Sequence, residues 1–248
     1  QPTNGDNSNM LFGNPSNAQN NTVAQDNFLI DQYYYVESYN ATRGTPNWVS
    51  WHLSDAWRGN ADRCDCFKGD YSFPSSFYKP TTRDYTGTGF NRGHLCPSAD
   101  RTYTDGANEN TFYMSNIAPQ SPDNNQQTWA NFENYLRSLT DEGKEIHIIS
   151  GVHGSGGTGS NGYAATIDSG QITVPDTFWK VALILDNGTD DINRVTTSTR
   201  VIAINVPNDQ GVNSNWAQYR TTVNAIENLT GYDLLENIPN SIEAVLES

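Results

Sequence analysis

The chain has 248 residues, with 28 acidic and 14 basic side chains and a formal net charge of −14. This charge excludes a protein that coats nucleic acid with clustered Lys and Arg, although it leaves room for an enzyme with a local positive site. No apolar run approaches the ~20 residues of a membrane span, so we expect no membrane partner.

The length fits a single domain. The first 27 residues are rich in Asn, Gly, Ser and Pro and show little apolar periodicity. We therefore expect a flexible N-terminal arm over residues 1–27 and one domain over residues 28–248.

Charged residues make up only 17% of the chain, while Asn, Ser, Thr, Gly and Tyr are frequent. This composition is typical of extracytoplasmic proteins. The chain also begins at Gln1, as a processed mature protein does. Together these features predict a secreted or periplasmic protein.

In the first half of the chain, β-forming residues over 33–40 and 47–53 predict two strands. The Gly- and Pro-rich stretch 54–90 predicts a long irregular loop, and such loops are usually functional. Residues 111–120 predict a short buried strand ended by Pro119. The helical spacing of four large apolar residues predicts a helix over 121–139; these residues are Trp129, Phe132, Leu136 and Leu139.

The second half predicts three buried strands, over 145–152, 171–185 and 199–207, because β-branched residues run almost continuously there. Residues 215–235 predict an amphipathic helix that Gly231 closes. Strands outnumber helices without a regular alternation of the two, so the fold class expected is α+β with a largely antiparallel sheet.

The three cysteines cannot all pair within one chain. Cys64 and Cys66 flank a single residue, and so small a ring strains disulfide geometry. A bridge from one of them to Cys96 is therefore the expected pairing.

The segment "NRGHLCPSADR" carries the most reactive residue types in the chain. His94 suits a general base because its ordinary pKa leaves it largely neutral at physiological pH. Arg92 offers a planar fork to phosphate oxygens, and Gly93 between them permits close approach of backbone or substrate. Taken alone, three residues fit equally a histidine that caps a turn beside an arginine in a surface ion pair.

The longer sequence segment favours a catalytic role for these residues. "NRGHLCPSADR" followed by "YMSNIAPQSPDNNQQTWANFE" closely resembles the DNA/RNA non-specific endonuclease family, the ββα-metal nucleases. The blocks "NWVSWHL", "SGVHG", "VPDTFWKVAL" and "WAQYRTTVNAIENLTGYDLLENIP" occur in the order of that family's remaining blocks. The resemblance covers most of the chain from about Phe28 to Leu246, and it implies the ββα-metal nuclease fold.

The resemblance also implies a site. It makes His94 the general base and Asn125 the one direct protein ligand of a Mg²⁺ ion, with Mn²⁺ or another divalent ion as an alternative. Glu133 matches a carboxylate that binds this metal through water. The other matching positions are a site asparagine, Asn116, and three arginines placed against the substrate phosphate, which are Arg63, Arg92 and Arg137; Arg58 is a rival for the position of Arg63.

Each of these residues also has an ordinary structural explanation. Asn125 could be a helix N-cap, and Glu133 with Arg137 could be an exposed ion pair. Helix geometry adds a constraint. In one regular helix the backbones of Asn125 and Glu133 would lie roughly 12 Å apart along the axis, so both cannot bind an ion at about 2.1 Å. We therefore expect Asn125 at or before the helix start, with Glu133 reaching the metal through water.

One position departs from the family pattern. The family usually has Asp where this chain has Asn91. An amide still accepts a hydrogen bond beside the metal, but it brings no negative charge, so we expect altered metal affinity or pH dependence rather than lost activity.

The function expected from the resemblance is magnesium-dependent hydrolysis of single- and double-stranded DNA and RNA to 5′-phosphorylated products. A DNA-selective nuclease, or a toxin-type nuclease with a dedicated inhibitor protein, is an alternative of the same fold. A third hypothesis is an inactive module that binds nucleic acid or polysaccharide through its 13 Tyr and 6 Trp residues. Monomer and homodimer are both open.

Overall fold

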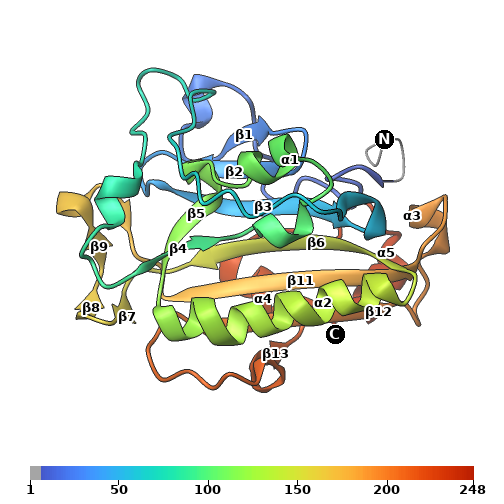
Figure 1. Ribbon diagram of the computed structural model, residues 1–248. Helices are drawn as coiled ribbons and strands as arrows, with labels where there is room; N and C mark the ends of the chain where they lie inside the picture. The colour runs from blue at the N-terminus through green and yellow to red at the C-terminus, as the bar shows by residue number, and fades with distance from the viewer. Residues whose placement is uncertain (1–6) are drawn as a thin grey trace.

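The computed structural model describes residues 7–248, and its main element is a seven-stranded antiparallel sheet (Figure 1). The strand order is β1-β2-β3-β6-β11-β12-β13. These strands are β1 (Phe28–Asp31), β2 (Val36–Asn40), β3 (Thr45–Leu53), β6 (Lys144–His153), β11 (Thr177–Asp186), β12 (Arg200–Pro207) and β13 (Arg220–Thr221). The expected α+β class with a largely antiparallel sheet is confirmed.

Among residues 7–248, three two-stranded sheets lie outside the main one. Their strands are β4 (Asn91–His94) with β5 (Ile117–Gln120), β7 (Gly157–Gly159) with β8 (Gly162–Ala164), and β9 (Thr166–Ile167) with β10 (Ile172–Thr173). The predicted strand over 171–185 is thus two strands, because Pro175 interrupts it. The predicted strand over 111–120 is only its last four residues, since a 3₁₀ turn precedes it.

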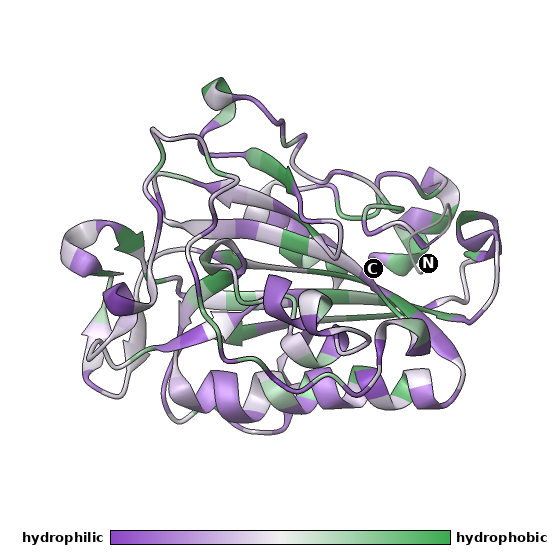
Figure 2. Cartoon of the chain, turned by 45° about the horizontal axis from the view of Figure 1, so that its top comes forward, coloured by the Kyte–Doolittle hydropathy of each residue, from purple (hydrophilic) through white to green (hydrophobic). Residues whose placement is uncertain are grey.

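Helices cover both faces of the sheet, and the five α-helices of the described residues are α1 (Asp105–Asn110), α2 (Ala130–Asp141), α3 (Asp191–Arg194), α4 (Val223–Thr230) and α5 (Asn240–Leu246). On one face, Phe132, Leu136 and Leu139 of α2 pack on the sheet. On the other face, α4 packs through Val223 and Ile226. Figure 2 shows the hydrophobic strands enclosed between these layers.

The predicted C-terminal helix is shorter than its apolar pattern. Thr222 caps α4 by accepting a hydrogen bond from the amide of Ala225, so the residues before it form a 3₁₀ turn and β13 instead. Gly231 ends α4 with φ 76°, which confirms the predicted stop. None of the helices among residues 7–248 is long and apolar enough to cross a membrane.

The segment expected to be a flexible arm lies against the domain over the residues that the structure describes. Trp48 Nε1 donates to Ser16 Oγ at 2.7 Å, and Ser50 Oγ donates to the carbonyl of Asn9 at 2.6 Å. Phe12 is buried in an apolar cluster with Leu183. Residues 1–6 lie outside the described part, and the domain boundary at residue 28 stays a prediction.

Candidate active site

The "NRGH" segment forms β4, which pairs with β5 so that Gly93 faces Ala118 and His94 faces Ile117. A Cβ on Gly93 would lie 2.3 Å from Gln120 Oε1 and 2.6 Å from Gln120 Cβ. Real Cβ atoms do not approach so closely, so this position requires glycine. The group that closely approaches Gly93 is therefore Gln120 of the neighbouring strand β5.

The helix after β5 begins at Pro122, and the amide of Asn125 already donates to the carbonyl of Ser121 at 2.9 Å. Asn125 therefore lies inside the helix, and the expectation that it lies at or before the helix start is wrong. Residues Asn124–Trp129 are π-helical, and Glu133 lies in the first turn of the regular α2 that follows. The change of helical geometry between them lets both side chains line one cavity, which a single regular α-helix would not favour.

This cavity has a volume of about 190 Å³. It brings together five of the predicted site residues from three parts of the chain. Its lining consists of Arg63, Arg92, His94, Pro97, Ser98, Asn125, Ala130 and Glu133. The long loop 54–90, β4 and the helix thus meet at one place.

His94 is buried, with 8% of its surface exposed, and its ring stands edge-on to Phe112 at 4.9 Å between centroids. Its Nε2 atom is buried and has no hydrogen-bond partner among the described residues. Burial, together with the positive charge of Arg63, lowers the pKa of His94 from 6.5 to about 3. The imidazole is therefore neutral at physiological pH and presents a nitrogen that can accept a proton.

Asn91 fixes the orientation of Asn125. The Nδ2 atom of Asn125 donates to Asn91 Oδ1 at 3.0 Å, and Gln126 Nε2 donates to the same oxygen at 2.8 Å. Because Nδ2 of Asn125 is engaged in this way, Oδ1 is the atom that Asn125 offers to the cavity. An oxygen acceptor is all that this position needs for that purpose, and the amide of Asn91 supplies one.

Glu133 is held from the side of the sheet by Lys180 of β11. Lys180 Nζ donates to Glu133 Oε1 at 3.3 Å, and the lysine side chain is fully buried. Burial raises the pKa of Glu133, and the charge of Lys180 opposes that rise. Lys180 is not among the site residues predicted from the sequence. Its signal was a single lysine inside the otherwise apolar run "TFWKVALIL".

The arginines divide into two groups. Arg63 and Arg92 line the cavity. Arg63 donates to Ser98 Oγ at 2.9 Å, and Arg92 donates to the carbonyl of Thr82. Arg58, the rival of Arg63, instead donates to Thr140 Oγ1 at 2.9 Å near the C-terminal end of α2. Of the two candidates, the structure places Arg63 at the cavity.

Arg137 and Asn116 do not line the cavity. Arg137 pairs with the buried Asp100 at 2.7 Å, so its predicted contact with a phosphate stays a prediction. Asn116 is fully buried and braces the chain just after His94. It accepts from the amide of Cys96 and donates to the carbonyl of the same residue, each at 2.9 Å. Arg137 and Asn116 therefore hold neighbouring parts of the chain in place without lining the cavity.

The cysteine pairing differs from the expectation. Cys64 and Cys66 form the disulfide, with Cα atoms 5.1 Å apart, and Cys96 is free and buried. The expected bridge to Cys96 is wrong. The reason is that Cys96 belongs to the main apolar core, packed with residues such as Leu95 and Trp129, whereas Cys64 and Cys66 lie on the long surface loop.

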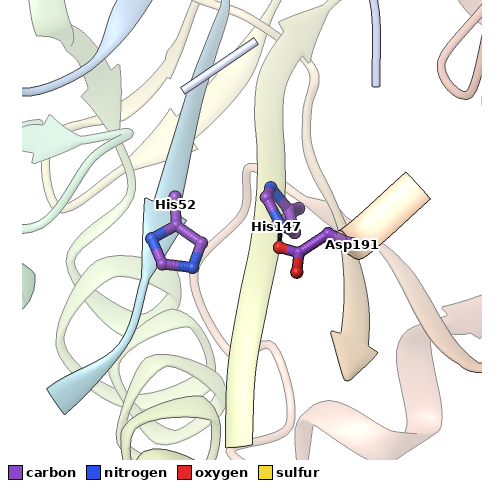
Figure 3. Close-up of side chains that lie close together, drawn as sticks. All are labelled: His52, His147 and Asp191. Atoms are coloured by element: carbon purple, nitrogen blue, oxygen red, sulfur yellow. Dashed lines mark hydrogen bonds and ion pairs between the residues drawn. The ribbon is translucent and has the colours of Figure 1, made fainter. Parts of the chain in front are cut away.

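A second group of metal-ligand residue types lies apart from this cavity (Figure 3). The ligand atoms of His52, His147 and Asp191 lie within 4.8 Å of one another. Hydrogen bonds already engage this group. His147 Nε2 is 2.8 Å from Asp191 Oδ2, and His52 Nε2 is 3.1 Å from Glu145 Oε2.

The tautomer of His52 argues that this group is a closed network. Trp57 Nε1 donates to His52 Nδ1 at 3.2 Å, and an indole N–H can only donate. His52 Nδ1 therefore accepts, and Nε2 carries the ring proton that Glu145 binds. Arg194 bonds both Glu145 and Asp191 at 2.6 Å and offsets their charge. These contacts give His52 and His147 a structural role, as the apolar surroundings of His147 in the sequence predict.

The fold is that of the ββα-metal nucleases, in which a two-stranded ribbon and a following helix carry the site. A chain in a crystal structure of the EndoG/EndoGI complex superposes with a TM-score of 0.76 at 23% identity, covering 94% of this chain and 91% of that one. A family model described as DNA/RNA non-specific endonuclease matches residues 13–241. The chain belongs to this family of metal-dependent nucleases and is a nucleic-acid hydrolase.

Curated relatives agree with this assignment. A nuclease of Nostoc sp. is 43% identical over 239 residues, which cover 96% of this chain and 84% of that protein. Human endonuclease G, mitochondrial, is 32% identical over 82% of this chain and 68% of its own length. Mouse nuclease EXOG, mitochondrial, is 33% identical over 78% of this chain, which spans only 53% of that protein.

The expected secreted or periplasmic localisation is wrong on these comparisons. The relatives include mitochondrial nucleases from mouse and human, and their names carry no mark of secretion. The expectation depended on overall composition. A low fraction of charged residues is a statistical trend among extracytoplasmic proteins and is not a targeting signal.

Proposed function

We propose that this chain is a magnesium-dependent endonuclease that hydrolyses both DNA and RNA, with His94 as general base and a 5′-phosphorylated product. The observation that carries the proposal is the cavity that His94 lines together with Asn125, Glu133 and two arginines. The family assignment supports the reaction class, and it favours an enzyme over the inactive binding module.

The residues fit a hard divalent cation. Asn125 offers Oδ1, because Asn91 engages its Nδ2, and Glu133 offers the carboxylate oxygen that Lys180 does not bind. Amide and carboxylate oxygens are the ligands that Mg²⁺ prefers, and it retains several waters. Asn125 would hold Mg²⁺ directly and Glu133 through water, and the ion would supply charge stabilisation on the phosphate and the departing 3′ oxygen.

The protein's own groups carry out the remaining steps. His94 accepts the proton of the attacking water, because burial keeps its imidazole neutral. Arg63 and Arg92 at the cavity wall orient the phosphate and offset its charge. The partly enclosed cavity, built on a ribbon and a helix, holds these groups in fixed relative positions.

Metal removal tests the proposed activity. We expect the protein to degrade single- and double-stranded DNA and RNA in Mg²⁺, to stop in EDTA, and to resume when Mg²⁺ is restored, because only the metal is withdrawn. Gel analysis of the four substrates measures this, and end-labelling of the products checks for 5′ phosphate. Undiminished cleavage in EDTA would contradict the proposal. Cleavage of DNA alone would favour the DNA-selective alternative.

The low pKa of His94 predicts the pH dependence of kcat/KM, which reports the free enzyme. A base with the ordinary pKa near 6.5 is protonated below that pH and loses activity about tenfold per unit. His94, with a pKa of about 3, keeps its active neutral form. We therefore expect kcat/KM at saturating Mg²⁺ to vary less than about threefold between roughly pH 6 and 7.5. An acid limb with its midpoint near pH 6.5 would contradict this.

An inhibitor protein is a candidate partner. The superposed crystal structure is one of EndoG inhibition in the EndoG/EndoGI complex. This similarity of fold supports a search for a protein that occludes the cavity of this chain, in addition to its nucleic-acid substrates.

A further inference from the structure

Lys180 is a buried cation in the strand beneath the cavity. Its side chain has no exposed surface, and it lies in β11, where every residue from Phe178 to Leu185 is buried. Removing an ammonium from water costs several kcal/mol unless a charge and good geometry compensate. Glu133 supplies that charge, since its Oε1 lies 3.3 Å from Lys180 Nζ.

Two tryptophans confine the ammonium. Lys180 Nζ lies 4.3 Å from the ring centroid of Trp129 and 5.3 Å from that of Trp51. Both rings are buried, with 1% of their surface exposed. Trp129 ends the π-helical turn that contains Asn125, and Trp51 lies in β3. The ammonium therefore has one position, fixed by cation–π contacts from two elements and the carboxylate of a third.

A second buried ion pair lies next to that of Lys180 and Glu133. Arg137, one helical turn beyond Glu133, pairs with Asp100, whose other oxygen accepts from Trp51 Nε1 at 2.9 Å. Arg137 is thus already engaged by Asp100, and Lys180 is the direct ionic partner of Glu133. Removing Lys180 would take that partner away from Glu133.

We propose that Lys180 is a positioning residue of the nuclease, which holds Glu133 Oε1 and thereby leaves Oε2 as the oxygen available on the cavity side. The inference rests on the proposed role of Glu133 in binding metal through water. Lys180 contacts neither substrate nor metal in this scheme. It acts by restricting one carboxylate, as outer groups around metal ligands do.

A double-mutant cycle with Lys180→Met and Glu133→Gln tests this. Methionine retains most of the side-chain volume between the tryptophans and removes the charge. We expect K180M to lower kcat/KM and to weaken Mn²⁺ binding to the apoprotein, measured by calorimetry, each about 10- to 100-fold. Because Lys180 acts through Glu133, adding K180M to E133Q should change neither quantity by more than about threefold.

Lys144→Met is the matched control. Lys144 is the first residue of β6 and pairs with the exposed Asp186; it lies six residues along β6 from Ser150, the residue that faces Lys180, so this variant should match wild type. Unfolding in urea checks that each variant is folded. Lys180→Leu, which also removes both the charge and the hydrogen-bond donor to Glu133, replaces K180M in the cycle if K180M does not fold.

The outcomes distinguish a failure of the positioning role of Lys180 from a failure of the proposed role of Glu133. Full activity of E133Q would overturn the proposed role of Glu133. An impaired E133Q beside a folded Lys180 variant with wild-type Mn²⁺ affinity would overturn the positioning role alone. Equal losses from the Lys180 substitution in both backgrounds would also overturn it, because Lys180 would then act independently of Glu133.

Discussion

Replacing His94 by alanine is expected to lower kcat about 10²- to 10⁴-fold on both DNA and RNA, the range that a positioned general base contributes. The reason is that the neutral imidazole of His94 lines the cavity, and alanine offers no proton acceptor in its place. Initial rates at saturating Mg²⁺ measure the loss. Since the metal-binding side chains remain, Mn²⁺ affinity should stay close to that of wild type.

His153→Ala is the matched control for this substitution. His153 ends β6 and is absent from the residues that line the cavity, so its loss should leave the rate unchanged. Circular dichroism and urea unfolding show whether each variant retains the fold. A folded His94→Ala protein with wild-type rates would rule out His94 as the base.

Replacing Asn125 by alanine is expected to reduce activity by more than about 100-fold, because losing a group that merely supports a metal ligand already costs roughly 10- to 100-fold. Asn91 accepts a hydrogen bond from Nδ2 of Asn125, which leaves Oδ1 of Asn125 available to bind the metal. Calorimetric titration with Mn²⁺ should show weakened binding in parallel with the rate. The two losses should match, since the substitution acts through the metal.

The neighbouring Gln127→Ala provides the comparison. Gln127 lies in the same π-helical turn, is exposed, and donates to Asp123 at 3.1 Å. The Gln127→Ala variant should bind Mn²⁺ and cleave nucleic acid as wild type does. If Asn125→Ala kept its Mn²⁺ affinity while losing activity, Asn125 would have to contact substrate instead of metal.

Asn91 illustrates what a substitution within a motif can leave intact. The family's usual Asp and this chain's Asn both present an oxygen acceptor, and the structure uses that oxygen to bind the amides of Asn125 and Gln126. The orientation of Asn125 therefore survives the change. Because the amide brings no negative charge, we expect altered metal affinity or pH dependence with this geometry retained.

The sequence by itself was enough to predict the α+β class, the helix after β5 and its apolar face, because residue periodicity encodes these features locally. The clustering of His94, Asn125 and Glu133 was predicted only from the resemblance to the family. The glycine stop at Gly231 is of the same kind, because a left-handed residue after a helix is a local requirement.

Only the tertiary structure decided which residues stand behind that motif. Lys180 lies 47 positions from Glu133, and Asn91 lies 34 positions from Asn125. No local pattern couples residues so distant, because sheet register and helix packing bring them together. Tertiary packing also decides that Arg63 rather than Arg58 lines the cavity. It likewise places Cys96 in the core, where it is not bridged to the surface loop. Local periodicity determines the elements of the chain, and long-range packing determines which reactive groups meet and how each is held.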